Sequence, residues 1–379
     1  MKRIRFLIVI FVFVFAFAIN ASANETADKI VSSIDKELDG FLSSLPDNVT
    51  DFFPNELLSG DFSTLTSGEI NEKSFLDLIS SYLISGINIV AKGFASILAL
   101  IIIISIFNTL CGALNNSNMS NILSLCSTLC IAITVFNICG SLVTNASEYM
   151  NILCNIMGAF IPLMLVLFTM SGGISTAIIT NGSMVLFINV VERFLIVFML
   201  PITKICLAFG CAKSLNGDID LGGISKTLKT TFTSVTVFTM SILMFVLSYK
   251  STLTQSVDSL SIKTARFAIS SFVPLVGSSV NDALRTVTSS LALIKNSCGV
   301  VAIISIVILM LPIIINLFLN KLSFSVLSSM SKAIGGYREA TILEEADSIC
   351  GFILTLVCCT CVLFIFALTI FLKTGAAAQ

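Results

Sequence analysis

The chain has 379 residues, of which 56% are hydrophobic and 11% charged, and its mean hydropathy is +1.01. Soluble globular domains carry roughly 25% charged residues, so this composition excludes an ordinary soluble protein and predicts a polytopic membrane protein. The formal net charge of −1 hides two regions of opposite sign. Residues 24–80 hold twelve acids against three lysines, whereas residues 81–379 hold fifteen bases against ten acids.

The N-terminus has the form of a signal peptide. A basic head and an apolar run over residues 6–19 precede the small-residue motif Ala21-Ser22-Ala23. About 14 apolar residues are few for a membrane span, which normally needs ~20. The sequence therefore predicts a signal peptide over residues 1–23 that is cleaved after Ala23, the alternative being an uncleaved first anchor.

Residues 24–86 form an acidic segment that is expected to lie outside the cytoplasm. Its apolar residues Ile34, Leu38 and Leu42 recur at helical spacing, and Pro46 interrupts the pattern. The segment is interpreted either as a solvated leader into the membrane or as a docking surface for a partner.

The rest of the chain is expected to be an all-α membrane bundle of about seven to eight spans. Each apolar run is near the length that crosses ~30 Å of hydrocarbon at a rise of 1.5 Å per residue. The segment 266–294 is more polar and is interpreted either as a broken span or as an interfacial or re-entrant piece. The other predicted spans lie near 87–110, 121–143, 150–170, 183–209, 231–249, 299–319 and 349–372.

Four of the six prolines form two matching pairs. Pro162 and Pro274 both stand in the pattern Phe-x-Pro-Leu, and they are 112 residues apart. Pro201 and Pro312 both stand in the pattern Met-Leu-Pro-Ile, and they are 111 residues apart. Such an offset predicts an internal three-helix repeat, as in transporter-like or channel-like bodies, although chance recurrence in so apolar a chain is the alternative. The predicted domains are two leading transmembrane helices over 87–149, a first repeat unit over 150–260 and a second over 261–379.

Charged side chains within the apolar runs are candidates for a polar path. Glu192 and Arg193 lie centrally in a predicted span, and Asp282 and Arg285 are i, i+3 neighbours on a helix. A lone charge in hydrocarbon costs several kcal/mol, so these groups are expected to face each other, protein or water. The alternative is that they lie at the membrane surface. Together with the four paired prolines they are the candidate structural or path residues.

Nothing in the sequence predicts an enzyme. There is no histidine, the Cys358-x-x-Cys361 pair has no second pair to complete a zinc site, and no nucleophile motif is present. We expect no catalytic residue, no metal and no cofactor. The Gly335-Gly336 break precedes Thr341-Ile342-Leu343-Glu344, which fits a capping box opening the last helix.

The order of these features resembles the stage III sporulation protein AE family of endospore-forming bacteria. The resemblance covers about residues 90–372 and is strongest between 260 and 300. It rests on the leader, the acidic segment and the first proline motif, followed by Ser171-Gly172-Gly173, Lys263-Thr264-Ala265-Arg266-Phe267, Phe272-Val273-Pro274-Leu275-Val276-Gly277, Leu293-Ile294-Lys295-Asn296 and Gly299.

The resemblance implies a sporulation membrane protein without catalytic residues. It implies a subunit of a channel-like or secretion-like complex between mother cell and forespore, located in the mother-cell-derived outer forespore membrane. The implied partners are other stage III A-series proteins and stage II sporulation protein Q of the forespore, with membrane lipid around it and no nucleic acid. From the residues alone, the alternative is a secondary transporter or permease with an inverted-repeat core.

Overall fold

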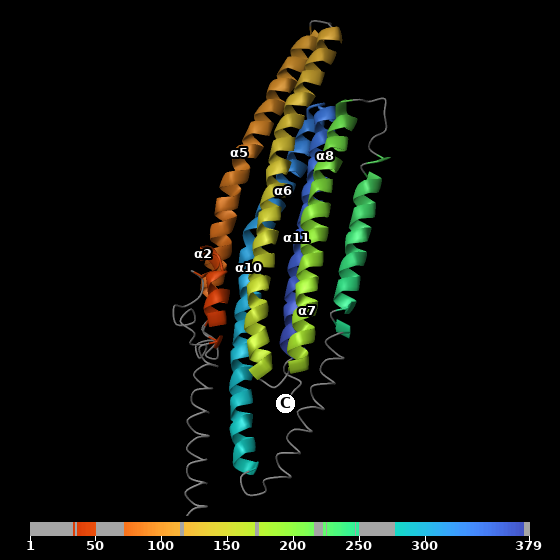
Figure 1. Ribbon diagram of the computed structural model, residues 1–379. Coiled ribbons are helices and arrows are strands. Elements are labelled where there is room, and N and C mark those ends of the chain that lie inside the picture. Colours follow the sequence, from red (N-terminus) through yellow and green to blue (C-terminus); the bar gives the residue numbers. More distant parts are fainter. Residues whose placement is uncertain are drawn as a thin grey trace, which may run out of the picture.

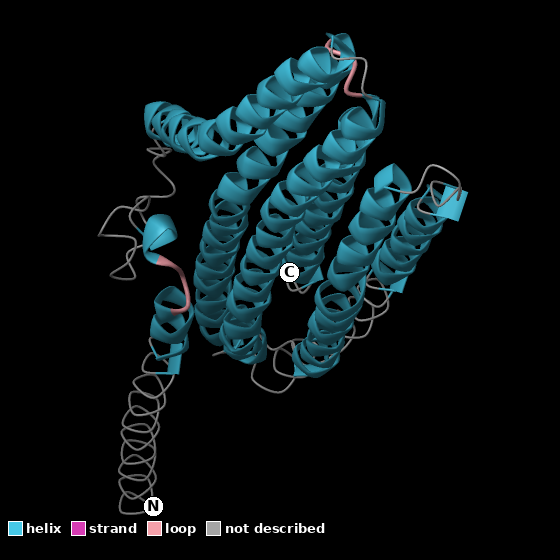
Figure 2. Cartoon of the chain, turned by 90° about the horizontal axis from the view of Figure 1, so that it is seen from above, coloured by secondary structure: helices cyan, strands magenta, loops and turns pink. Residues whose placement is uncertain are grey.

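The computed structural model describes residues 33–34, 36–50, 72–113, 117–170, 174–215, 223–224, 226–246, 248–249 and 277–374. The regular structure of these residues is helical, which confirms the predicted all-α membrane fold (Figures 1 and 2). The elements are α2 (Asp47–Thr50), α5 (Glu72–Ala113), α6 (Ser117–Met170), α7 (Ile174–Val191), the π-helix η1 (Glu192–Met199), α8 (Leu200–Leu215), a helix at Lys226–Val246, α10 (Gly277–Ala333) and α11 (Tyr337–Thr374).

The long helices lie side by side and run alternately up and down (Figure 1). The α5–α6 hairpin projects beyond its neighbours at one end, and the start of α10 projects at the other. With 54 residues, α6 is roughly 80 Å long at 1.5 Å per residue, far more than the ~30 Å of a hydrocarbon core. The longest helices therefore reach well beyond a bilayer.

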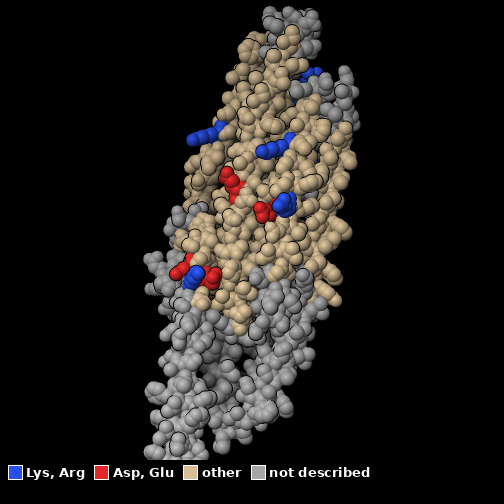
Figure 3. Space-filling view, viewed as in Figure 1, with Lys and Arg blue, Asp and Glu red and all other residues tan. Residues whose placement is uncertain are grey.

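Six helices of the described residues are long and apolar enough to cross a membrane. Large apolar side chains such as Ile84, Phe238 and Phe245 are exposed on the outside of the bundle, and charged side chains are sparse on the face shown in Figure 3. Such an apolar exterior suits lipid rather than water. The candidate spans are Asp77–Phe107, Leu125–Thr169, Gly182–Ala212, Lys226–Val246, Ser297–Ala333 and Tyr337–Ile370.

The α10–α11 hairpin forms the centre of the bundle and contacts α5, α6 and α8. Its helices are joined by a turn at Gly335, whose φ of 90° favours glycine. The Gly336 N–H donates to the Ser331 carbonyl at 2.9 Å and the Gly335 N–H to the Lys332 carbonyl at 3.0 Å, which is a Schellman cap. The two glycines thus end α10 and reverse the chain.

The capping box predicted at Thr341 is wrong. Helix α11 already begins at Tyr337, and the Thr341 hydroxyl donates to the Tyr337 carbonyl at 2.9 Å, four residues back within the helix. Because the Gly335 turn ends α10 so abruptly, the chain can start the next helix as soon as the turn is complete.

The predicted boundary between the spans 121–143 and 150–170 is also wrong, since α6 runs through both without a break. The six residues between them include no glycine or proline, and Ala146 is fully buried. The Thr144 hydroxyl donates to the Gly140 carbonyl at 3.1 Å, so this polar side chain is satisfied by its own helix. The polar residues at 144–149 lower the local hydropathy as a loop would, although they belong to one continuous helix.

In the same way, α10 joins residues 277–294 to the predicted span 299–319 in one helix. Residues 266–276 lie outside the described residues, as do the leader and Pro274. The described part of the second predicted repeat unit therefore contains α10 and α11, and the three-helix repeat stays a prediction.

Residues 36–50 of the acidic segment pack against the bundle. Leu38, Phe41, Leu45 and Val49 are buried, and the Phe41 ring contacts that of Phe160 edge-on with centroids 5.4 Å apart. The predicted helical spacing thus places an apolar stripe against α6, and the chain turns at Pro46 into α2. These residues dock on the bundle instead of forming a purely solvated leader.

Candidate functional site

The three paired prolines that the structure describes do not share one structural context. Helices α6 and α10 continue through Pro162 and Pro312, whereas Pro201 is the second residue of α8 and stands two residues after the end of η1. A proline at position 201 cannot donate to the Val197 carbonyl. The chain responds with wider turns, and the Leu200 N–H donates to the Leu195 carbonyl, five residues back, as in a π-helix.

Of the predicted charged residues, the structure describes the side chains of Glu192 and Arg193, and these two have different surroundings. Glu192 begins η1 and is half-buried, whereas Arg193 next to it is exposed beside an open groove lined by Phe194 and Phe198. The backbone of Asp282 and Arg285 lies in α10, while their side chains are outside the described part of the structure.

The ion pairs that the described residues do form gather on the first third of α11. Lys229 of the 226–246 helix pairs with Glu345 and also donates to the Ser348 hydroxyl at 3.2 Å. The two further pairs join α10 to α11: Lys321 with Asp347 at 2.8 Å, and Lys332 with Glu344.

Glycine gives these side chains room. A Cβ atom added to Gly210 of α8 would lie 2.9 Å from both Cβ and Cγ of Glu345, so α8 and α11 approach closely where Glu345 crosses. Lys321 similarly lies across Gly351, with its Nζ 3.6 Å from where a Cβ would stand. Glu345 and Lys321 therefore cross neighbouring helices where glycine leaves space for them.

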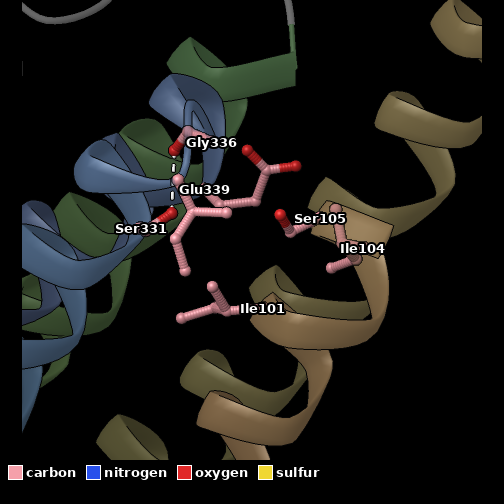
Figure 4. A pocket seen from close by; sticks show the side chains of 7 residues that line it. Ile101, Ile104, Ser105, Ser331, Gly336 and Glu339 are labelled. Atoms are coloured by element: carbon pink, nitrogen blue, oxygen red, sulfur yellow. Dashed lines mark hydrogen bonds between the residues drawn. The ribbon is translucent and has the colours of Figure 1, made fainter. Parts of the chain in front are cut away.

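A further acid, Glu339 in the first turn of α11, is buried with 3% of its surface exposed. Its Oε1 accepts a hydrogen bond from the Ser127 hydroxyl of α6 at 2.8 Å and a longer one from Thr128 at 3.5 Å. In Figure 4 the carboxylate points into a small cavity opposite Ser105 of α5. The cavity is lined by Ile101, Ile104, Ser105, Ser331, Ile334, Gly336 and Glu339.

Sequence reasoning missed this site. Glu339 follows the Gly335-Gly336 break by three residues, and that break was its one available signal. Its partner Ser127 is 212 residues away and stands in a run with other serines and threonines, so nothing marked it. Among the described residues, no three His, Cys, Asp or Glu side chains gather as a metal cluster.

The hairpin turn that positions Glu339 can be tested directly. Replacing Gly335 with Ala should lower the free energy of unfolding by about 1–2 kcal/mol, because a Cβ disfavours its positive φ. Gly335→Asn should lose less, since asparagine tolerates this conformation better. Equilibrium unfolding in mixed micelles measures both variants, and equal losses would contradict the role assigned to φ.

Fold and site together define a polytopic helical membrane protein with a buried carboxylate, Glu339, and with ion pairs that join neighbouring helices. A family model described as stage III sporulation protein AE matches residues 59–375, and the chain belongs to this family. It is 22% identical over 324 residues to "Stage III sporulation protein AE" of Bacillus subtilis (strain 168), which covers 84% of this chain and 79% of that relative. No solved structure matches the chain.

Proposed function

We propose that the protein is a non-enzymatic, integral-membrane subunit of a channel-like or secretion-like complex that connects the mother cell with the forespore. Its membership of the stage III sporulation protein AE family over residues 59–375 carries this proposal. Six candidate spans suit a multi-pass subunit. The membrane proposed is the mother-cell-derived outer forespore membrane, entered by way of the cleaved leader.

The proposed partners are other stage III A-series proteins and stage II sporulation protein Q. The docked residues 36–50 support a partner surface at that end of the bundle, because Phe41 and Val49 anchor them against helices that cross the membrane. Acidic side chains of the same segment, such as Glu37 and Asp39, are left at the surface or partly exposed.

Deletion of the gene in its spore-forming host tests the proposal. The yield of heat-resistant spores should fall by orders of magnitude while vegetative growth stays normal, and a tagged full-length copy should restore spores and co-purify with stage III A-series proteins. Normal sporulation of the deletion strain would contradict the role. Altered solute uptake in vegetative cells, without a complex, would favour the transporter alternative instead.

A further inference from the structure

The buried carboxylate of Glu339 has no cationic side chain beside it among the described residues. Lys229, Lys321 and Lys332 each pair with a different acid of α11. An ionised carboxylate that is 97% removed from solvent is strongly disfavoured unless its charge is balanced. The N-terminus of α11 supplies about half a positive charge, which offsets this only in part.

The oxygen atoms around the cavity are arranged so that they could coordinate a small ligand. Oε1 of Glu339 is occupied by the Ser127 hydroxyl, while within the described structure no donor reaches Oε2. Oε2 faces Gly336, where an added Cβ would come within 3.2 Å of it. The Ser331 hydroxyl donates to the Gly336 carbonyl at 2.8 Å, which leaves its own lone pairs available.

The size of the cavity limits its ligand to one water molecule or one small ion. Its volume is about 10 Å³, close to the least space that holds a single water molecule. Besides Glu339, its polar wall consists of the hydroxyls of Ser105 and Ser331 (Figure 4). Hydroxyl and carboxylate oxygens are the ligands of hard cations.

We propose that this cavity binds one monovalent cation of the size of Na⁺. Glu339 supplies the balancing negative charge, and Ser105 and Ser331 supply hydroxyl oxygens. A single carboxylate matches a single positive charge, and the other acids of this part of α11 are engaged by lysines, which disfavours a divalent ion. The bound ion would join α5, α10 and α11, with α6 holding the carboxylate through Ser127.

Binding of radioactive ²²Na⁺ to the purified full-length protein tests the proposal. The experiment is run at fixed pH and ionic strength, with choline replacing sodium, and thermal unfolding is followed in the same buffers. We expect saturable binding of about one ion per chain and a melting temperature that rises with Na⁺ concentration. The inference does not rest on the proposed function, since neither readout involves sporulation.

Matched variants locate the ion. Glu339→Gln should abolish both ²²Na⁺ binding and the sodium-dependent shift, whereas Glu344→Gln, an exposed acid on the same helix, should keep both. Ser105→Ala removes one proposed ligand without touching the bond from Ser127 to Glu339, and should weaken binding roughly tenfold or more. If Glu339→Gln does not fold, the affinity of Ser105→Ala for ²²Na⁺ tests whether the ion binds in this cavity.

Any of three results of the binding experiment would overturn the proposal. The first is an absence of saturable ²²Na⁺ binding by the wild-type chain. The second is binding that survives Glu339→Gln, and the third is unchanged affinity in Ser105→Ala. Stabilisation that depends on pH and on Glu339 but not on sodium would assign a proton to the carboxyl group, and so would reject the cation.

Discussion

Replacing Lys229 with Met is expected to lower the free energy of unfolding by about 3–5 kcal/mol, because removing one partner of a buried ion pair leaves the other charge in a poorly solvated place. The side chains of Lys229 and Glu345 are 15% and 16% exposed. The 226–246 helix is the least buried of the six candidate spans, so this pair is a major tie between it and the bundle. Equilibrium unfolding in mixed micelles measures the loss.

Lys332→Met is the matched control. The Lys332–Glu344 pair is 49% and 50% exposed, and its loss should cost about 0–1 kcal/mol. Replacing Lys229 and Glu345 together by Met should recover much of the stability lost in the single variant, since no unpaired charge then remains. A similar loss in Lys229→Met and Lys332→Met would show that burial does not set the strength of these pairs.

The fold class could be predicted from composition because a chain so poor in charge can satisfy its backbone in lipid only within helices or closed barrels. The lengths of the apolar runs then favoured helices. Helix ends were harder to predict. Hydropathy measures the environment of side chains, and a helix such as α6 can pass through a polar patch at Thr144 when nothing in its backbone stops it.

The docking of residues 36–50 was predicted only as a pattern. Helical spacing of Ile34, Leu38 and Leu42 indicated an apolar face, but not what that face covers. Its contact, Phe160, is more than a hundred residues away and lies beside the first paired proline. Local periodicity fixes which side of a helix is apolar, while the partner depends on the tertiary arrangement.

The candidate site shows the same limit. The sequence drew attention to Glu192 and Arg193 because they interrupt an apolar run. Within the part of the chain that the structure describes, however, the acids that form ion pairs are on α11, and their lysine partners are on two other helices. Pro201 and Pro312 look equivalent in sequence, but only Pro201 follows a π-helix. Whether a helix continues through a proline or changes to wider turns before it depends on neighbouring helices, which a four-residue motif does not contain.

The close approach of α8 to α11 depends on the absence of a side chain at position 210. Gly210→Leu is expected to lower the free energy of unfolding by about 2–3 kcal/mol, the usual range for overpacking a close contact. Its Cβ would stand 2.9 Å from the Cβ of Glu345, an atom close to the α11 backbone that cannot swing away as a side-chain tip can. Helix α8 must then move off α11, which also pulls Glu345 from Lys229.

Gly140→Leu in α6 is the matched control for Gly210→Leu. Position 140 is half-exposed, and no atom lies within 4 Å of where its Cβ would stand. There leucine should be neutral or stabilise the protein by up to about 1 kcal/mol, because it favours a helix more than glycine does. The two variants make the same chemical change in a helix, so unfolding in mixed micelles isolates the effect of the contact with Glu345. Equal stability of the two variants would mean that α8 and α11 have room for a side chain at position 210, and that Glu345 reaches Lys229 without the space that glycine leaves.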